Sequence, residues 1–129
     1  MKPIALILAQ YFATPSEVFF YRRTIGLQDI MPTVACYHRL HPANFPFDKC
    51  HELASSRLVP RVVNAALRRV GLIKPWDALE YDRRFAEITT TLQPDLILCE
   101  SGWVAARLID SLESIRVPVA VSFWGSDIN

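Results

Sequence analysis

The sequence has few glycines and few cysteines, and each shortage excludes a class of protein. Its four glycines are too scattered for a phosphate-cradling loop or a dinucleotide-binding fingerprint, and it has no Gly-x-Ser-x-Gly elbow. Its three cysteines are too few for a disulfide framework, which suits a reducing compartment such as the cytoplasm. No stretch approaches transmembrane length.

An excess of charge of either sign is also lacking. The formal net charge is +1, so no overall field attracts nucleic acid, and we expect no nucleic-acid partner. A hydrophobic content of 51% and a charged content of 21% are those of one globular domain with a real core. Residues 1–9 superficially resemble a short secretory signal, but they lead directly into a helix start, so we expect a strand there instead.

Apolar runs alternate with amphipathic stretches along the chain. The runs predict buried strands at residues 4–10, 33–38, 95–100 and 117–123. Helical spacing predicts helices at about residues 14–28, 61–70, 81–92 and 104–115, and residues 39–56 are predicted to form a loop. One face of the helix at 81–92 is predicted to be apolar, with Tyr81, Phe85, Ile88 and Leu92. In the first helix, Thr14 and Glu17 would form a capping box around Pro15. The pattern is typical of an α/β fold, a Rossmann-like parallel sheet with helices on both faces.

The order of the strands decides where a ligand would bind. If residues 95–100 return to the other side of the first strand through a right-handed crossover, the strand order reverses between these two strands. The loops then diverge and leave a crevice at the carboxyl ends of the strands. We therefore expect one cleft lined by residues 11–17, 100–103 and 124–127.

Several segments resemble family 4 glycosyltransferases of the GT-B fold. Residues 15–20, Pro-Ser-Glu-Val-Phe-Phe, are similar to the helix start that follows the first strand in that family. The apolar strand after Pro94-Asp95, the Gly102-Trp103 turn and the segment Phe123-Trp124-Gly125-Ser126-Asp127-Ile128 resemble the family's Pro-Asp-hydrophobic strand and its His-Gly-Ser-Asp-Ile segment. These motifs stand in the family's order and spacing.

The resemblance implies that residues 1–129 are one Rossmann-like domain, the acceptor-binding half of a retaining glycosyltransferase of polysaccharide biosynthesis. The complete enzyme would move a sugar from a nucleotide-sugar to a glycan or lipid-linked acceptor. The family's donor-side Glu-x7-Glu signature is missing, so we interpret the chain as truncated, without its nucleotide-sugar domain and inactive alone. No metal or other cofactor is expected, and we name no catalytic nucleophile in this half.

The resemblance also implies which residues bind the acceptor: Ser16, Glu17, Glu100, Ser101, Gly102, Trp103, Gly125, Ser126 and Asp127. The family commonly has histidines where this chain has Leu98, Glu100 and Trp124. A carboxylate at Glu100 accepts hydrogen bonds from sugar hydroxyls, whereas it cannot donate to a phosphate as a charged imidazole does. The substitutions therefore favour a neutral polyol or glycan acceptor over a phosphorylated one.

Each of these residues also has a purely structural interpretation. Ser16 and Glu17 can simply belong to the helix start, and Glu100 can cap the helix that follows it. Asp127 can close a turn through its own backbone. Trp103 and Trp124 can stack on a sugar ring or pack at the edge of the core. The sequence leaves these alternatives open.

Two other classes of function stay open as well. One is a non-catalytic binding or regulatory module of flavodoxin-like shape. The other is a metal-binding protein, because one segment gathers the ligand types that zinc prefers: Cys36, His38, His41, Cys50 and His51. Their spacing matches no standard zinc pattern.

Positive charge gathers around one predicted helix, in Arg57, Arg61, Arg68 and Arg69. The same helix has an apolar side made of Val62, Val63, Ala66, Leu67 and Val70. Such a helix can lie on an anionic membrane. Transferases of the family that this sequence resembles often act at the inner leaflet on lipid-linked acceptors. The alternative is that this side packs against the sheet. We expect a cytoplasmic protein with peripheral contact at the inner membrane face.

Overall fold

The computed structural model describes residues 1–54, 58–72 and 79–124. The first half of this part holds β1 (Ile4–Phe12), the 3-10 helix η1 (Pro15–Glu17), α1 (Val18–Gly26), β2 (Met31–Arg39) and β3 (Cys50–Glu52). The second half holds α2 (Leu58–Arg69), α3 (Leu79–Leu92), β4 (Leu96–Cys99), α4 (Gly102–Arg107), α5 (Ile109–Glu113) and β5 (Val119–Val121). The four predicted strands are confirmed, the last two over shorter spans.

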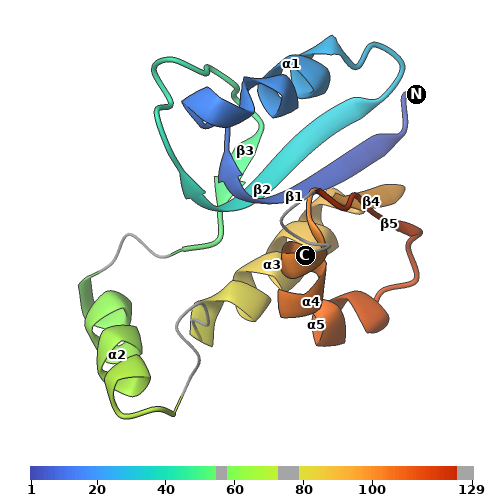
Figure 1. Ribbon diagram of the computed structural model, residues 1–129. Coiled ribbons are helices and arrows are strands. Elements are labelled where there is room, and N and C mark those ends of the chain that lie inside the picture. The colour runs from blue at the N-terminus through green and yellow to red at the C-terminus, as the bar shows by residue number, and fades with distance from the viewer. Residues whose placement is uncertain (55–57, 73–78, 125–129) are drawn as a thin grey trace.

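The strands form one parallel sheet in the order β3-β2-β1-β4-β5 (Figure 1). In its register, Leu6 of β1 lies opposite Thr33 of β2 on one side and opposite Ile97 of β4 on the other. The chain therefore builds the sheet outward from β1 in one direction and then returns to build in the other. The predicted reversal between β1 and β4 and the α/β Rossmann-like class are both confirmed.

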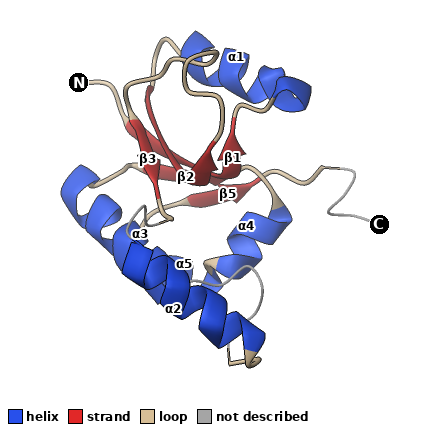
Figure 2. Ribbon diagram, turned by 90° about the vertical axis from the view of Figure 1, so that its left-hand side faces the viewer, coloured by secondary structure: helices blue, strands red, loops and turns tan. Residues whose placement is uncertain are grey.

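Helices cover both faces of the sheet. Figure 2 shows α1 on one face and α3, α4 and α5 on the other, with α2 lying outside them on that same side. Alternate residues of β1 serve the two faces: Leu6 and Leu8 join one buried cluster, and Ile7 and Ala9 join the other.

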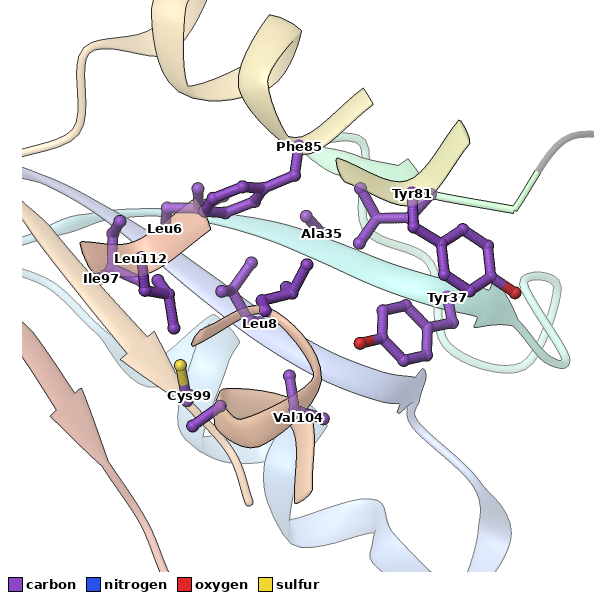
Figure 3. Close-up of a cluster of buried hydrophobic side chains, with 13 residues drawn as sticks. Leu6, Leu8, Ala35, Tyr37, Tyr81, Phe85, Ile97, Cys99, Val104 and Leu112 are labelled. Carbon is purple, nitrogen blue, oxygen red and sulfur yellow. The ribbon is translucent and has the colours of Figure 1, made fainter. Parts of the chain in front are cut away.

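The larger cluster lies between the sheet and α3, α4 and α5 (Figure 3). Tyr81 and Phe85 of α3 are buried against β1 and β2, and Ile88 and Leu92 pack beside them. These four residues are the predicted apolar face of that helix, and full burial of a large side chain such as Phe85 stabilises the fold by about 1.5–3 kcal/mol. The smaller cluster lies under α1 and includes Phe12, Val34 and Cys36.

The prediction of a continuous loop over residues 39–56 is wrong, because β3 pairs with β2 inside it. The connection between these parallel strands holds no helix in the described structure. Its aromatic side chains cover the sheet instead: the Phe47 ring lies 5.6 Å from the Phe12 ring, and Tyr21 Oη donates to the Pro46 carbonyl at 3.0 Å. The strand escaped prediction because Cys50-His51-Glu52 has no apolar alternation; backbone bonds such as Val34 N to the Lys49 carbonyl, 2.8 Å, hold it.

Two predicted helices differ from the structure. The capping box is wrong: Thr14 makes no side-chain bond to a backbone amide, and its hydroxyl donates to the Glu17 carboxylate at 3.1 Å. The first turn is 3-10, since the Glu17 amide donates to the Thr14 carbonyl three residues earlier at 2.9 Å. The helix predicted over residues 104–115 divides at Leu108 into α4 and α5. The bend still leaves both Leu108 and Leu112 buried in the larger cluster.

Candidate functional site

A cleft of about 510 Å³ lies at the carboxyl ends of β1 and β4, where the strand order reverses. Four of the predicted site residues line it: Glu17, Glu100, Ser101 and Trp103. The remaining lining residues come from the end of β1, from α1 and from the segment after β5: Ala9, Gln10, Tyr11, Phe19, Phe20 and Trp124. The described parts of the three segments predicted to face one another, 11–17, 100–103 and 124, therefore each contribute to one cleft.

Of the other predicted site residues, the structure describes two, Ser16 and Gly102, and neither is in the cleft lining. Ser16 is exposed on η1, and its hydroxyl lies 3.1 Å from that of Thr14. Gly102 begins α4, and a Cβ atom there would lie 2.6 Å from the Phe123 ring, so it serves a close approach. Gly125, Ser126 and Asp127 lie outside the described residues.

Glu100 is the most buried polar group of the cleft, with 4% of its surface exposed. One of its oxygens, Oε1, accepts from the Arg23 guanidinium of α1. The other, Oε2, is buried and has no hydrogen-bond partner within the described part of the chain. Its backbone is fixed on two sides, because its amide donates to the Leu8 carbonyl at 2.8 Å and its own carbonyl accepts from Trp124 Nε1 at 2.5 Å.

The interpretation of Glu100 as a helix cap is wrong. Ser101 is the N-cap of α4, since its hydroxyl accepts from the Val104 amide at 3.2 Å. Ser101 therefore both caps this helix and lines the cleft. The Glu100 carboxylate is left to face Arg23 and the cleft.

An aromatic wall stands beside Glu100. The rings of Phe19 and Trp124 are 5.1 Å apart, and the ring of Phe20 meets Trp124 edge-on at 5.5 Å. The Arg23 guanidinium lies 5.5 Å from the Phe20 ring, and burial lowers its pKa. Sequence reasoning did not name Phe19, Phe20 or Arg23 as site residues, although the spacing of 19, 20 and 23 on a helix places them on one side.

A second hollow of about 370 Å³ adjoins the cleft and shares Gln10, Tyr11 and Trp103 with it. Its other walls are Tyr37, His38, Arg68 and Tyr81. The rings of Tyr37 and Tyr81 are stacked at 4.8 Å, and Tyr11 and His38 are stacked at 6.2 Å. The crevice thus continues from Glu100 across the ends of β1 and β2.

The described residues hold no group of three or more histidine, cysteine or acidic side chains placed to bind a metal ion. The five zinc-type residues divide among different places. Cys36 is buried in the smaller cluster with Cys50 packed against it, whereas His38 is exposed beside the second hollow. No helix within the described ranges has the length and apolar character needed to cross a bilayer.

Comparison with known proteins gives no relative: no family model matches the chain, and no curated protein or solved structure is significantly similar to it. Its α/β Rossmann-like class follows from the strand order and the parallel pairing alone. What the cleft can bind must be argued from its own residues.

Proposed function

We propose that the cleft binds a sugar acceptor and that the domain is the acceptor-binding half of a retaining GT-B glycosyltransferase. One observation carries the proposal. Glu100 is held by Arg23 at the reversal of the strand order, and its second carboxylate oxygen is buried with no partner among the residues that the structure describes. Because leaving a buried acceptor unpaired costs about 1–3 kcal/mol, a ligand hydroxyl that donates to Oε2 would recover that free energy.

The walls of the cleft support a carbohydrate ligand. The exposed faces of Phe19 and Trp124 offer apolar surface to a sugar ring, while Glu17 and Glu100 offer acceptors to its hydroxyl groups. A hydroxyl held in this way is fixed in place relative to a second reactant, which is how such a half-site contributes to transfer. The donor nucleotide-sugar would be held by a second domain.

The charge of the cleft favours a neutral acceptor. Its described lining contains two carboxylates, Glu17 and Glu100, and no lysine or arginine. Arg23 neutralises Glu100 from outside the lining. A phosphorylated acceptor would meet Glu17 without a facing cation, so a neutral glycan or polyol is the better fit.

The proposal is tested by titrating the 15N-labelled protein with neutral disaccharides and polyols and following amide shifts by NMR. We expect shifts at Glu100, Ser101 and the Trp103 and Trp124 indoles. Glu100→Gln should weaken binding by roughly 10- to 100-fold, because a hydrogen bond to a charged group is lost. The matched control is Glu113→Gln, an exposed residue of α5. Shifts confined to other surfaces, or equal affinity in both variants, would contradict acceptor binding.

The transferase part of the proposal has a separate test in the coding sequence. A second Rossmann-like domain with a Glu-x7-Glu signature after residue 129 supports a glycosyltransferase. A stop codon there, together with saccharide binding in the NMR titration, would instead support the non-catalytic binding module.

We further propose that α2 holds the protein against the anionic inner face of a membrane. Val62, Ala66 and Val70 follow one another at four-residue spacing and are all exposed, Val62 by 57% and Val70 by 69%. The opposite side of α2 faces the protein, since Asn64 is buried and donates to the Glu80 carboxylate at 2.8 Å. The apolar side therefore does not pack against the sheet.

The charges around this apolar stripe suit anionic lipid. Arg61 and Arg69 are exposed on α2, and each basic residue near an anionic surface contributes about 1 kcal/mol. Arg68 is half-buried and lines the second hollow, and Arg57 lies outside the described residues. An amphipathic helix of this kind lies in the plane of the interface.

Sedimentation with anionic liposomes at low and high salt tests the membrane proposal. We expect binding at low salt that weakens at high salt, because salt screens exposed charges. Val62→Glu should abolish it, whereas Ala65→Glu, which adds the same charge to an exposed position outside the stripe, should only reduce it. Failure of the unaltered protein to sediment at low salt would refute the proposal.

A further inference from the structure

Two cysteines that the proposed function does not use lie side by side in the sheet. Cys36 is near the end of β2, and Cys50 is the first residue of β3. Their sulfur atoms are 3.8 Å apart. Both are free thiols in the structure, and both side chains lie in the smaller cluster under α1.

The register explains why the two sulfurs meet. Cys50 lies opposite Val34, and Cys36 lies opposite Glu52, so the two cysteines are diagonal neighbours on adjacent strands. Side chains two residues apart on a strand point to the same face. Both thiols therefore emerge on one side of the sheet, as the approach of two sulfurs requires.

The two thiols differ in access and in acidity. Cys36 is fully buried, whereas Cys50 is half-buried. The hydrogen bond between them raises the pKa of Cys36 and lowers the pKa of Cys50, burial raises the pKa of Cys36 further, and the charge of Arg39 helps to lower that of Cys50. Cys50 is therefore the member of the pair that presents a thiolate to a reagent from solution.

We propose that Cys36 and Cys50 form a reversible disulfide by exchange with a small disulfide of the glutathione type. The Cys50 thiolate attacks the oxidised glutathione, which forms a Cys50–glutathione bond and releases one glutathione thiolate. The Cys36 sulfur then attacks the Cys50 sulfur, the Cys36 proton passes to the departing glutathione sulfur, and the two-electron oxidation of the pair is balanced by reduction of one glutathione disulfide.

The surroundings permit the remaining approach of the sulfurs. An S–S bond is about 2.05 Å long, so the two sulfur atoms must come closer than their present 3.8 Å. Because the cysteines are diagonal neighbours on paired strands, this requires a shift of β3 along β2. β3 has three residues and lies at the outer edge of the sheet. It can therefore shift along β2 without displacing another strand of the described sheet. The bond would clamp β3 and the connection over residues 40–49 to the sheet.

The third cysteine provides a natural control. Cys99 lies in β4 and belongs to the larger cluster on the opposite face, where burial raises its pKa to about 11. It has no cysteine neighbour among the described residues. It should keep its thiol under conditions that oxidise the pair.

The experiment treats the purified chain with oxidised glutathione, quenches in acid, and measures intact mass and free thiols after unfolding. We expect the free thiols to fall from three to one, with the mass lower by two hydrogens and peptide mapping that joins Cys36 to Cys50. The bond should raise Tm by roughly 5–15 °C, because it closes a loop of about 15 residues. Dithiothreitol should reverse both changes.

Three variants separate this proposal from non-specific oxidation. Cys36→Ala should stop at the mixed disulfide, with the mass of one glutathione added, because Cys50 then lacks its resolving thiol. The Cys50→Ser variant should keep its two remaining thiols, those of Cys36 and Cys99. The Cys99→Ala variant should still form the bond between Cys36 and Cys50. Retention of three thiols in the unaltered chain, bonding through Cys99, or formation only of bonds between molecules would overturn the proposal.

Discussion

Glu100 shows what a single residue's sequence context can and cannot reveal. A polar residue at the end of a buried strand, two residues before a glycine, was predicted to cap a helix or to meet a ligand. The cap is Ser101, and the structure adds a partner that neither interpretation contained: Arg23, 77 residues earlier in the chain. No local pattern specifies a pairing across that separation, because it depends on how α1 crosses the end of β4. The position of Glu100 was predictable, but its ion pair was not.

The ion pair predicts an asymmetric effect of two neighbouring arginines on stability. Arg23→Met should lower the free energy of unfolding by about 1–3 kcal/mol, since it leaves the Glu100 carboxylate buried without its cation. Arg22→Met, at an exposed position of the same helix, should change it by less than about 0.5 kcal/mol. Urea unfolding followed by circular dichroism measures both, and equal losses in the two variants would mean that Glu100 does not depend on Arg23.

The cysteine pair predicts how thiol alkylation depends on pH. Because the Cys36 hydrogen bond lowers the pKa of Cys50, more of Cys50 is thiolate at neutral pH than in an ordinary cysteine. Arg39 acts in the same direction, whereas Glu52 and burial oppose it. Cys36→Ala removes the hydrogen bond, so the pKa of Cys50 should rise and its reaction with iodoacetamide at neutral pH should slow by about 3- to 10-fold.

The alkylation rates of Cys50 in the unaltered protein and in the Cys36→Ala variant should converge at high pH. Above the pKa that Cys50 has in each protein, its thiol is fully ionised in both. Cys99→Ala is the matched control and should leave the profile of Cys50 unchanged, because Cys99 lies on the other face of the sheet. If the pH profile of Cys50 alkylation is identical with and without Cys36, the hydrogen bond between the two thiols does not lower the pKa of Cys50.

At the scale of elements, periodicity predicted the long segments well and the short ones poorly. The amphipathic pattern of Tyr81, Phe85, Ile88 and Leu92 gave α3 and its buried face correctly. β3 was missed because its three residues are fixed by bonds to β2 and not by their own composition. The break between α4 and α5 was missed because both halves carry the same apolar spacing, with Leu108 and Leu112 buried in the same cluster.

Replacement by alanine should have opposite effects at two glycines, Gly102 at the start of α4 and Gly26 at the end of α1. Gly102→Ala should destabilise the protein by about 1 kcal/mol, because its Cβ would lie 2.6 Å from Phe123 Cε1 and would displace that ring. Gly26→Ala is the matched control: it ends α1, has no atom within 4 Å of the added methyl group and has no positive φ. It should stabilise the protein by up to about 1 kcal/mol, because alanine lowers the conformational entropy of the unfolded chain.

Thermal unfolding of both variants measures these effects, and Phe123→Ala provides a further check. If the clash with Phe123 causes the loss, Gly102→Ala should cost less when Phe123 is also replaced. If Gly102→Ala lowers stability equally with Phe123 present and with Phe123→Ala, the effect arises from the backbone of α4 instead.

At the scale of the whole molecule, the position of the cleft followed from topology before any side chain was placed. Alternating strands and helices with right-handed crossovers leave few ways to order a parallel sheet. The confirmed pairing of β1 with both β2 and β4 puts the divergent loops at one edge. Which residues fill that edge depended on long-range packing: Phe19 and Phe20 joined the cleft, whereas Ser16 and Gly102 are outside its lining.

The sheet also makes its two cores one cooperative unit. The larger cluster and the smaller cluster lie on opposite faces, yet both are built on alternate residues of β1 and β2. Neither face can lose its packing without exposing the strand that carries the other. Phe85→Ala in the larger cluster and Phe12→Ala in the smaller one should each cost about 3–5 kcal/mol, out of a total of roughly 5–15 kcal/mol for such a domain.

Both variants should still unfold in a single transition. Far-ultraviolet circular dichroism reports the helices and strands, and tryptophan fluorescence reports the cleft through Trp103 and Trp124, so the two midpoints should shift together. Ile109→Ala, at an exposed position of α5, should leave the midpoints within the range of an ordinary surface change. If Phe12→Ala instead separated the two curves, α1 and the smaller cluster would unfold by themselves, and the Glu100–Arg23 contact would be lost before the sheet.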